Sequence, residues 1–128
     1  MESLLEPTIE DFFSELQFPE ESCILQVVQQ HFRQQSDGRY RMFLTLSDGR
    51  FSFKGFIITS VSPPPGENSL LRIPRSPANR VKILELKDNL GTFGFIKLGE
   101  YKKILDGAHC NKIGTPVELR DWNKQIQS

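Results

Sequence analysis

Residues 39–46 alternate strictly between two kinds of side chain, and this pattern constrains the fold more than any other feature of the chain. Successive side chains of a β-strand point to opposite faces of a sheet, so a period of two predicts a strand with one buried face. The buried set is Tyr40, Met42, Leu44 and Leu46, and the opposite set is Arg39, Arg41, Phe43 and Thr45. The exposed face of this strand then carries two guanidinium groups and an aromatic ring.

Other β-type runs are separated by turn and loop signals. Asp37-Gly38 and Asp48-Gly49 predict turns on either side of the alternating strand. Gly55, inside the next run, predicts a bulge or a sharp bend. Proline-rich residues 62–68 and 74–77 predict loops. The predicted strands lie near residues 22 to 33, 39 to 47, 50 to 57, 80 to 87 and 92 to 101. In the third of these, alternation predicts that Phe51 and Phe53 point inward and that Arg50, Ser52 and Lys54 point outward.

The N-terminal segment has a helical period instead. Ile9, Phe12, Phe13 and Leu16 recur at spacings of three and four, with acidic residues on the other side. We therefore predict one short amphipathic helix over residues 8–16, which Pro19 ends.

One helix followed by about five short strands with glycine bends favours a mainly β fold. The predicted architecture is a five-stranded OB-fold barrel with a short N-terminal amphipathic helix. An SH3-like barrel and an open α+β sheet are the alternatives. A length of 128 residues with 38% hydrophobic side chains fits one domain. We expect this domain to span residues 1–120, with residues 1–21 as its acidic leader and helix, and residues 121–128 to form a polar tail or the start of a linker.

The formal net charge of zero hides a strong segregation of charge. Residues 1–21 contain seven acidic residues and no Lys or Arg, whereas residues 22–128 hold all 16 basic residues and nine acidic ones. Five basic residues cluster within 22 positions, and the acids among them, Asp37 and Asp48, adjoin turn glycines. Such a cluster focuses positive potential and attracts carboxylates or phosphates. The cluster consists of Arg33, Arg39, Arg41, Arg50 and Lys54.

Motifs for catalysis, metal binding and membrane insertion do not occur in the sequence. Cys23 and Cys110 are far apart and form no C-x-x-C unit, so we expect free thiols. No phosphate-binding, nucleophile or zinc-protease motif is found. No apolar run approaches the roughly 20 residues that span a bilayer. The acidic N-terminus does not resemble a secretory signal. We therefore expect an intracellular protein that is not an enzyme, has no cofactor or metal, and is not inserted in a membrane.

Several elements, in this order and spacing, resemble the N-terminal OB domain of the large subunit of replication protein A. They are Leu5 and Ile9 ahead of the helix, Ile24-Leu25-Gln26-Val27, Arg39-Tyr40-Arg41 leading into Leu46-Ser47-Asp48-Gly49, a strand ending in Phe56, a turn with Lys87-Asp88, and Ile113-Gly114-x-Pro116-Val117. The resemblance covers nearly the whole chain.

The resemblance implies a nuclear protein-recruitment module of a single-stranded-DNA-binding complex. Such a domain captures acidic, amphipathic segments of replication, repair and checkpoint proteins in a basic cleft, binds single-stranded DNA weakly, and meets other subunits through regions outside this chain. His31 stands where the family usually has a further cleft arginine, and Lys54 and Ile57 fall on the strand that lines the cleft floor. The predicted partner-binding residues are His31, Arg33, Arg39, Arg41, Phe43, Lys54, Ile57, Lys87 and Phe93.

The chain departs from this family at two places. Pro63-Pro64-Pro65 leave little room for the helix that normally follows the third strand. Asn89-Leu90 stand where a second basic residue normally follows the turn lysine, here Lys87. We therefore expect the far wall of the cleft to be less basic than in the family.

Two other interpretations of the basic strand stay open. Arg39 and Arg41 are also what a solvated edge strand carries to prevent aggregation. The barrel is also a candidate for direct single-stranded nucleic-acid binding, including telomeric DNA, in which bases stack on rings such as Phe43 and Phe93. Only Phe43 is predicted to be an exposed ring, and one ring is a small platform for stacking.

Overall fold

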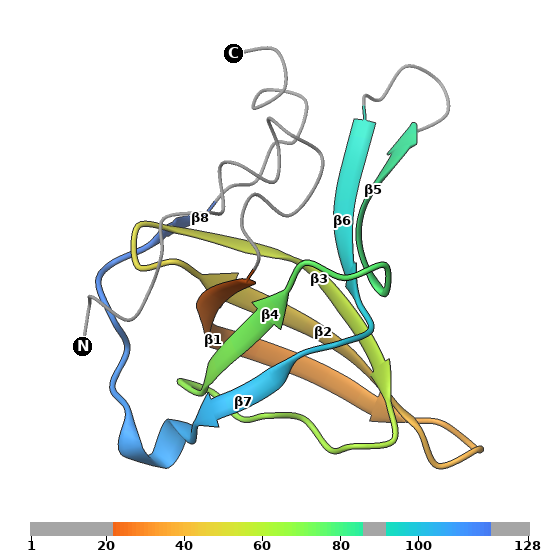
Figure 1. The fold of residues 1–128 in the computed structure, drawn as a ribbon, viewed down its shortest axis with the longest axis horizontal. Coiled ribbons are helices and arrows are strands. Elements are labelled where there is room, and N and C mark those ends of the chain that lie inside the picture. Colours follow the sequence, from red (N-terminus) through yellow and green to blue (C-terminus); the bar gives the residue numbers. More distant parts are fainter. Residues whose placement is uncertain (1–21, 86–91, 119–128) are drawn as a thin grey trace.

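The computed structural model describes residues 22–85 and 92–118, and its fold is mainly β (Figure 1). The predicted helix over residues 8–16 and the acidic leader lie outside the described residues. Within the two described ranges the only helix is the short 3-10 helix η3. The elements are β1 (Ser22–Gln34), β2 (Tyr40–Ser47), β3 (Phe51–Ser60), β4 (Leu70–Pro74), β5 (Asn79–Glu85), β6 (Thr92–Leu98), β7 (Lys102–Leu105), η3 (Gly107–His109) and β8 (Val117–Glu118).

The strands form one curled sheet with the shape of a half-barrel. Their order is β5-β6-β3-β2-β1-β4-β7, and β8 adds to β3. Neighbours are antiparallel except that β3 runs parallel to β6 and to β8. In Figure 1, β1, β2 and β3 lie side by side, and the β5–β6 hairpin projects from the body beside β3.

The alternation in β2 sets the core as predicted. Met42, Leu44 and Leu46 are completely buried, whereas Arg41 and Phe43, on either side of Met42, are exposed. Full burial of such a side chain contributes about 1.5–3 kcal/mol. These residues join one cluster with the buried faces of the neighbouring strands, which include Leu25, Val27, Phe56, Ile58, Leu71, Ile73, Ile96 and Leu98. This core fixes which face of the sheet is left for solvent.

The predicted irregularity at Gly55 is confirmed, and it changes one prediction nearby. Leu44 pairs with Phe56 and Leu46 with Phe53, so β3 has one more residue than β2 between these pairs. Phe53 is buried and Lys54 exposed, as alternation predicted. The outward prediction for Ser52 is wrong, because β2 and β8 flank this residue on both sides and leave it 5% exposed.

The second half of the chain forms one long antiparallel pair with a bend. β5 pairs with β6, and β4 pairs with β7, so residues 70–85 and 92–105 are two arms interrupted at 75–78 and 99–101. The side chain of Asn79 holds the bend: it donates to the carbonyls of Pro74 and Glu100 at 2.8 and 2.9 Å. Its Oδ1 accepts from the amides of Gly99 and Glu100 at 2.8 and 2.9 Å. Because of this bend, the arm of residues 92–105 pairs with β3 through β6, and the arm of residues 70–85 pairs with β1 through β4. The sheet is therefore curled.

Two strand predictions need correction in this half. No strand was predicted between the loops expected over residues 62–68 and 74–77, but Leu70–Pro74 forms β4, where Leu70, Leu71 and Ile73 are buried against β1. The predicted run over 92–101 ends at Leu98, where the amides of Gly99 and Glu100 donate to the side chain of Asn79, and Gly99 lies close to Ala78. A Cβ on Gly99 would lie 2.8 Å from the carbonyl oxygen of Ala78.

Candidate functional site

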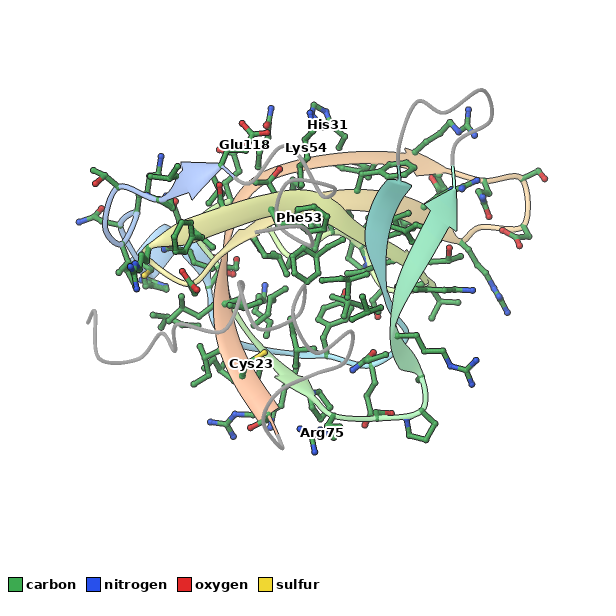
Figure 2. The ribbon with its side chains drawn as sticks, turned by 90° about the horizontal axis from the view of Figure 1, so that it is seen from above. Cys23, His31, Phe53, Lys54, Arg75 and Glu118 are labelled. Atoms are coloured by element: carbon green, nitrogen blue, oxygen red, sulfur yellow. The ribbon has the colours of Figure 1, made fainter. Side chains whose placement is uncertain are left out.

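The exposed face of the β1–β2 hairpin carries the basic cluster. Arg33 pairs with Arg41, and His31 pairs with Phe43, so these four residues form two adjacent cross-strand pairs on the side away from the core. A hollow of about 410 Å³ opens here. We call it the β1–β2 hollow, and its lining residues are His31, Phe32, Arg33, Arg41 and Phe43. Figure 2 shows His31 pointing away from the sheet at this side.

Arg41 and Phe43 contact each other on this face. The guanidinium carbon of Arg41 lies 5.6 Å from the centroid of the Phe43 ring, within the range of a cation–π contact. The ring itself is 42% exposed. Because a guanidinium stacked on a ring keeps its N–H donors at the edge of its plane, Arg41 is oriented and still able to bind a carboxylate with two hydrogen bonds.

The arginines of this face have no carboxylate partner in the part of the chain that the structure describes. The ion pairs found there join Lys54 to Glu118 and Lys103 to Asp106. Strands β1, β2, β3 and β6 contain no Asp or Glu at all. Arg33 and Arg41 therefore present positive charge that this sheet does not neutralise, which focuses potential at the hollow.

Arg39 lies apart from the hollow, in the turn that precedes β2. Its backbone amide donates to the carboxylate of Asp37 at 3.0 Å, a local bond that shapes the turn and leaves the guanidinium exposed. Arg39 thus extends the basic surface toward the hairpin tip without lining the cavity.

Lys54 and Ile57 come from β3 and differ in position. Ile57 pairs with Phe43 and is half-buried, so it continues the apolar surface next to the hollow. Lys54 lies on the other side of the Gly55 bulge, and its ammonium is 3.8 Å from Glu118 (Figure 2). An exposed pair of this kind is worth at most about 1 kcal/mol. Lys54 is therefore not part of the hollow.

The structure does not describe the side chains of the last two predicted site residues, Lys87 and Phe93. Lys87 lies outside the described residues. Phe93 belongs to β6 and pairs with Leu84, but its side chain is outside the part of the structure that is described. The structure thus brings His31, Arg33, Arg41 and Phe43 together, with Ile57 beside them.

Phe32 is a site residue that sequence analysis missed. It is 54% exposed, lines the hollow, and makes an edge-to-face contact with Tyr40 at a centroid distance of 6.2 Å. Phe32 pairs with Met42, yet Met42 is buried and Phe32 is not, because β1 extends beyond the core at this end. The length of the β-type run that begins at residue 22 was the sequence signal that could have indicated a strand extending beyond the core.

Two basic residues near the apolar surface were missed as well. Lys97 pairs with Ile57 through the parallel β3–β6 contact, and Arg80 pairs with Lys97 across the β5–β6 hairpin. Both are exposed. They lie beside the floor of the proposed cleft, on the side that was expected to be less basic. Nothing local in the sequence indicates that residues 57 and 97 are neighbours.

A second, larger hollow of about 550 Å³ lies elsewhere, between the β3–β4 loop and the β6–β7 connection. Its walls include Pro63, Pro64 and Tyr101, and none of the predicted partner-binding residues. Burial raises the pKa of Tyr101, so its phenol stays neutral at physiological pH.

Other kinds of site were looked for in the same described ranges. Residues 22–85 and 92–118 contain no group of three or more His, Cys, Asp or Glu side chains placed to hold a metal ion. Cys23 and Cys110 are buried and are not joined by a disulfide. No helix in these two segments is long and apolar enough to cross a membrane.

Comparison with known proteins adds no family. A scan against models of protein families finds no match to this chain, and a search of curated proteins finds no significant relative. The resemblance to the replication protein A domain thus stays a prediction carried by the residues quoted above.

Proposed function

We propose that this chain is a protein-recruitment module that docks acidic, amphipathic segments on the β1–β2 hollow and the apolar surface beside it. In this proposal the partners are replication, repair and checkpoint proteins, the module belongs to a nuclear single-stranded-DNA-binding complex, and its other subunits bind through regions outside this chain. The observation that carries the proposal is that Arg33 and Arg41 line a hollow next to Phe43 without an internal carboxylate partner in the described sheet.

An OB-fold barrel is the finer architecture that we propose for the curled sheet. If the two bent arms are each counted as one strand, the neighbours run β1, β2, β3, the β6–β7 arm, the β4–β5 arm, and β1 again. This circular order with a parallel contact between the third and last strands supports a five-stranded Greek-key barrel. The face made by the second and third strands, which binds ligands in such barrels, includes Phe43 and Ile57.

In this proposal, charged groups and apolar area contribute differently to binding. Exposed ion pairs contribute only about 0.2–1 kcal/mol each, so the carboxylates of a partner set its orientation and association rate. Phe43 and Ile57 supply apolar contact for one face of an amphipathic helix. Together these terms lead us to expect micromolar affinity, about −8 kcal/mol.

The test is an NMR titration of the labelled protein with an acidic amphipathic peptide, for the wild type and for Arg41→Glu. We expect shift changes around the hollow, and a dissociation constant raised at least about tenfold by the substitution, because attraction becomes repulsion. Arg72→Glu is the matched control, since Arg72 is exposed on β4 away from this face. An unchanged dissociation constant for Arg41→Glu would exclude the hollow as the docking site.

Direct binding of single-stranded nucleic acid is the second candidate, and the exposure of Phe32 favours it. Phe43 lies on the outer face with the two arginines, and Phe32, on the face of Met42 and Tyr40, adds a second exposed ring at this end of the hairpin. Exposed rings beside cations are the chemistry of base stacking and backbone contact. Salt separates the two candidates. Oligonucleotide affinity should fall with a slope of about −0.7 in log salt for each phosphate contacted, whereas an acidic peptide on an apolar surface should lose affinity more gradually.

A further inference from the structure

One row of outward residues crosses five strands of the sheet. The register aligns His31 of β1 with Phe43 of β2, Ile57 of β3, Lys97 of β6 and Arg80 of β5. The strand neighbours of the three middle residues Phe43, Ile57 and Lys97 are buried in the core, and these neighbours are Met42, Leu44, Phe56, Ile58, Ile96 and Leu98. His31 and Arg80, at the two ends, are themselves exposed. The row therefore lies on the outer face, and we call it the outer row.

The chemistry of the outer row changes along its length. It begins with the imidazole of His31 beside Arg33 and Arg41, passes over the apolar pair Phe43 and Ile57, and ends with the cations Lys97 and Arg80. The surface is thus basic at both ends and apolar in the middle.

A hydrogen bond to the backbone restrains Arg80 at the second basic end of the row. The Nε of Arg80 donates to the carbonyl oxygen of Pro77 at 2.9 Å, which restrains the guanidinium and leaves its terminal nitrogens as donors. Lys97 is exposed, and neither residue has an ion pair within the described ranges. No ion pair among the described side chains therefore neutralises either end of the row.

From this arrangement we infer that the docking site is two-ended: it binds a protein segment with carboxylates at both ends of an apolar centre. This inference rests on the proposed function and adds the charge order of the partner. His31 and Lys97 are three strand spacings apart, about 14 Å, which a helix of about nine residues spans. A partner with all its acids at one end leaves the other basic end without a counter-charge.

A two-ended protein segment fits the row better than a nucleic acid does. A single strand carries one charge at every nucleotide and binds through contacts to its backbone together with stacking of its bases on aromatic rings. The centre of the row offers the aliphatic Ile57 next to Phe43, which packs against apolar side chains but is no stacking platform. The order basic, apolar, basic matches acidic, apolar, acidic in a partner.

The experiment compares three peptides of identical composition and length. One has Glu residues at both ends of a Leu-rich centre, and the other two have the same Glu residues gathered at one end. We expect the two-ended peptide to bind the wild type about three- to tenfold more tightly than either of the others. Equal affinity for all three would overturn the two-ended site.

Charge reversal then assigns the second end to β6. Lys97→Glu should weaken binding of the two-ended peptide about three- to tenfold. Two further peptides carry Lys in place of Glu, one at the N-terminal end and the other at the C-terminal end. Only one of these two peptides should recover most of the lost affinity for the variant. Arg72→Glu is the control of equal charge change, and amide spectra of each variant verify that it folds. Recovery by Lys at either end equally, or no effect of Lys97→Glu, contradicts the inference.

The outcomes keep the two proposals apart. If Arg41→Glu weakens binding but Lys97→Glu does not, recruitment at the hollow stands and the two-ended site is wrong. If neither substitution changes peptide affinity, both proposals fail. If an oligonucleotide binds more tightly than every peptide and loses affinity with Lys97→Glu, the row is a nucleic-acid surface and the two-ended protein site is wrong.

Discussion

The Asn79 amide and the Arg41 guanidinium belong to the same curled sheet but use their hydrogen-bonding groups in opposite ways. Asn79 is 5% exposed and makes four hydrogen bonds, all to backbone groups at the bend between the two arms. Arg41 is exposed, contacts the ring of Phe43, and has no carboxylate partner among the described residues. A polar group satisfied inside the fold holds that fold together, whereas one left facing a hollow is available to a partner.

This comparison predicts that substitutions at the two places affect different quantities. Changes at the bend should lower the free energy of unfolding and leave the intrinsic affinity of the folded protein unaltered. Changes at the hollow should lower the affinity for a partner and leave the free energy of unfolding nearly unaltered. A substitution that moves both quantities strongly would break the distinction.

The largest expected effect is on stability, from Asn79→Ala. The substitution removes four part-buried hydrogen bonds, two of them from the amides of Gly99 and Glu100, so we expect a loss of about 3 kcal/mol or more in the free energy of unfolding. Urea denaturation with an unchanged m-value measures it. Asn111→Ala is the matched control, since the Asn111 side chain is exposed and should tolerate the change within about 0.5 kcal/mol. A loss at Asn79 no larger than at Asn111 would show that the bend does not depend on this amide.

The intermediate effect is on affinity, from Phe43→Ala. The ring is 42% exposed, so its removal should lower stability by less than about 1 kcal/mol through lost cross-strand contacts. The same change removes the platform under Arg41 and part of the apolar floor, so the dissociation constant for an acidic amphipathic peptide should rise about three- to tenfold. Calorimetric titration of the folded variant measures this. The comparison is wrong if Phe43→Ala costs as much stability as Asn79→Ala and leaves peptide affinity unchanged.

Sequence alone predicted what depends on neighbours along the chain. The period of two in β2 identified the buried face and the exposure of Arg41 and Phe43. The glycine in β3 indicated the bulge. These features follow from the geometry of one strand and its turns.

What sequence analysis missed depends on contacts between distant segments. β4 lies between prolines and shows no alternation, and it is a strand because Leu71 and Ile73 pack against β1. Lys97 reaches the apolar floor only because β6 runs parallel to β3, a pairing with no local signal. Phe32 is exposed because β1 is longer than the core beneath it. The surface positions of Phe32, Lys97 and Arg80 were therefore invisible to periodicity, and the last two form the second basic end of the outer row.

The smallest expected effect concerns Asp106, which combines features of both places. Its side chain is exposed, like those of the hollow arginines, yet its carboxylate is used internally as the cap of η3. It accepts from the amide of Ala108 at 2.9 Å and from the ammonium of Lys103 at 3.1 Å. The backbone hydrogen bond from Ala108, followed by Lys103, lowers the pKa of Asp106 below its ordinary 3.8.

The direction of this shift fixes the sign of its effect on stability. The folded state binds the proton of Asp106 less readily than the unfolded state does, so the cap stabilises the fold above the ordinary pKa of 3.8 and this stabilisation is lost as the pH falls below that value. Asp106→Asn keeps an acceptor for Ala108 and removes the titration. The variant should therefore show a slightly weaker dependence of unfolding on pH in that acidic window, with peptide affinity at neutral pH unchanged. NMR titration of the Asp106 carboxyl carbon measures the shift directly, and a midpoint at or above 3.8 would mean that solvent exposure outweighs the internal hydrogen bonds.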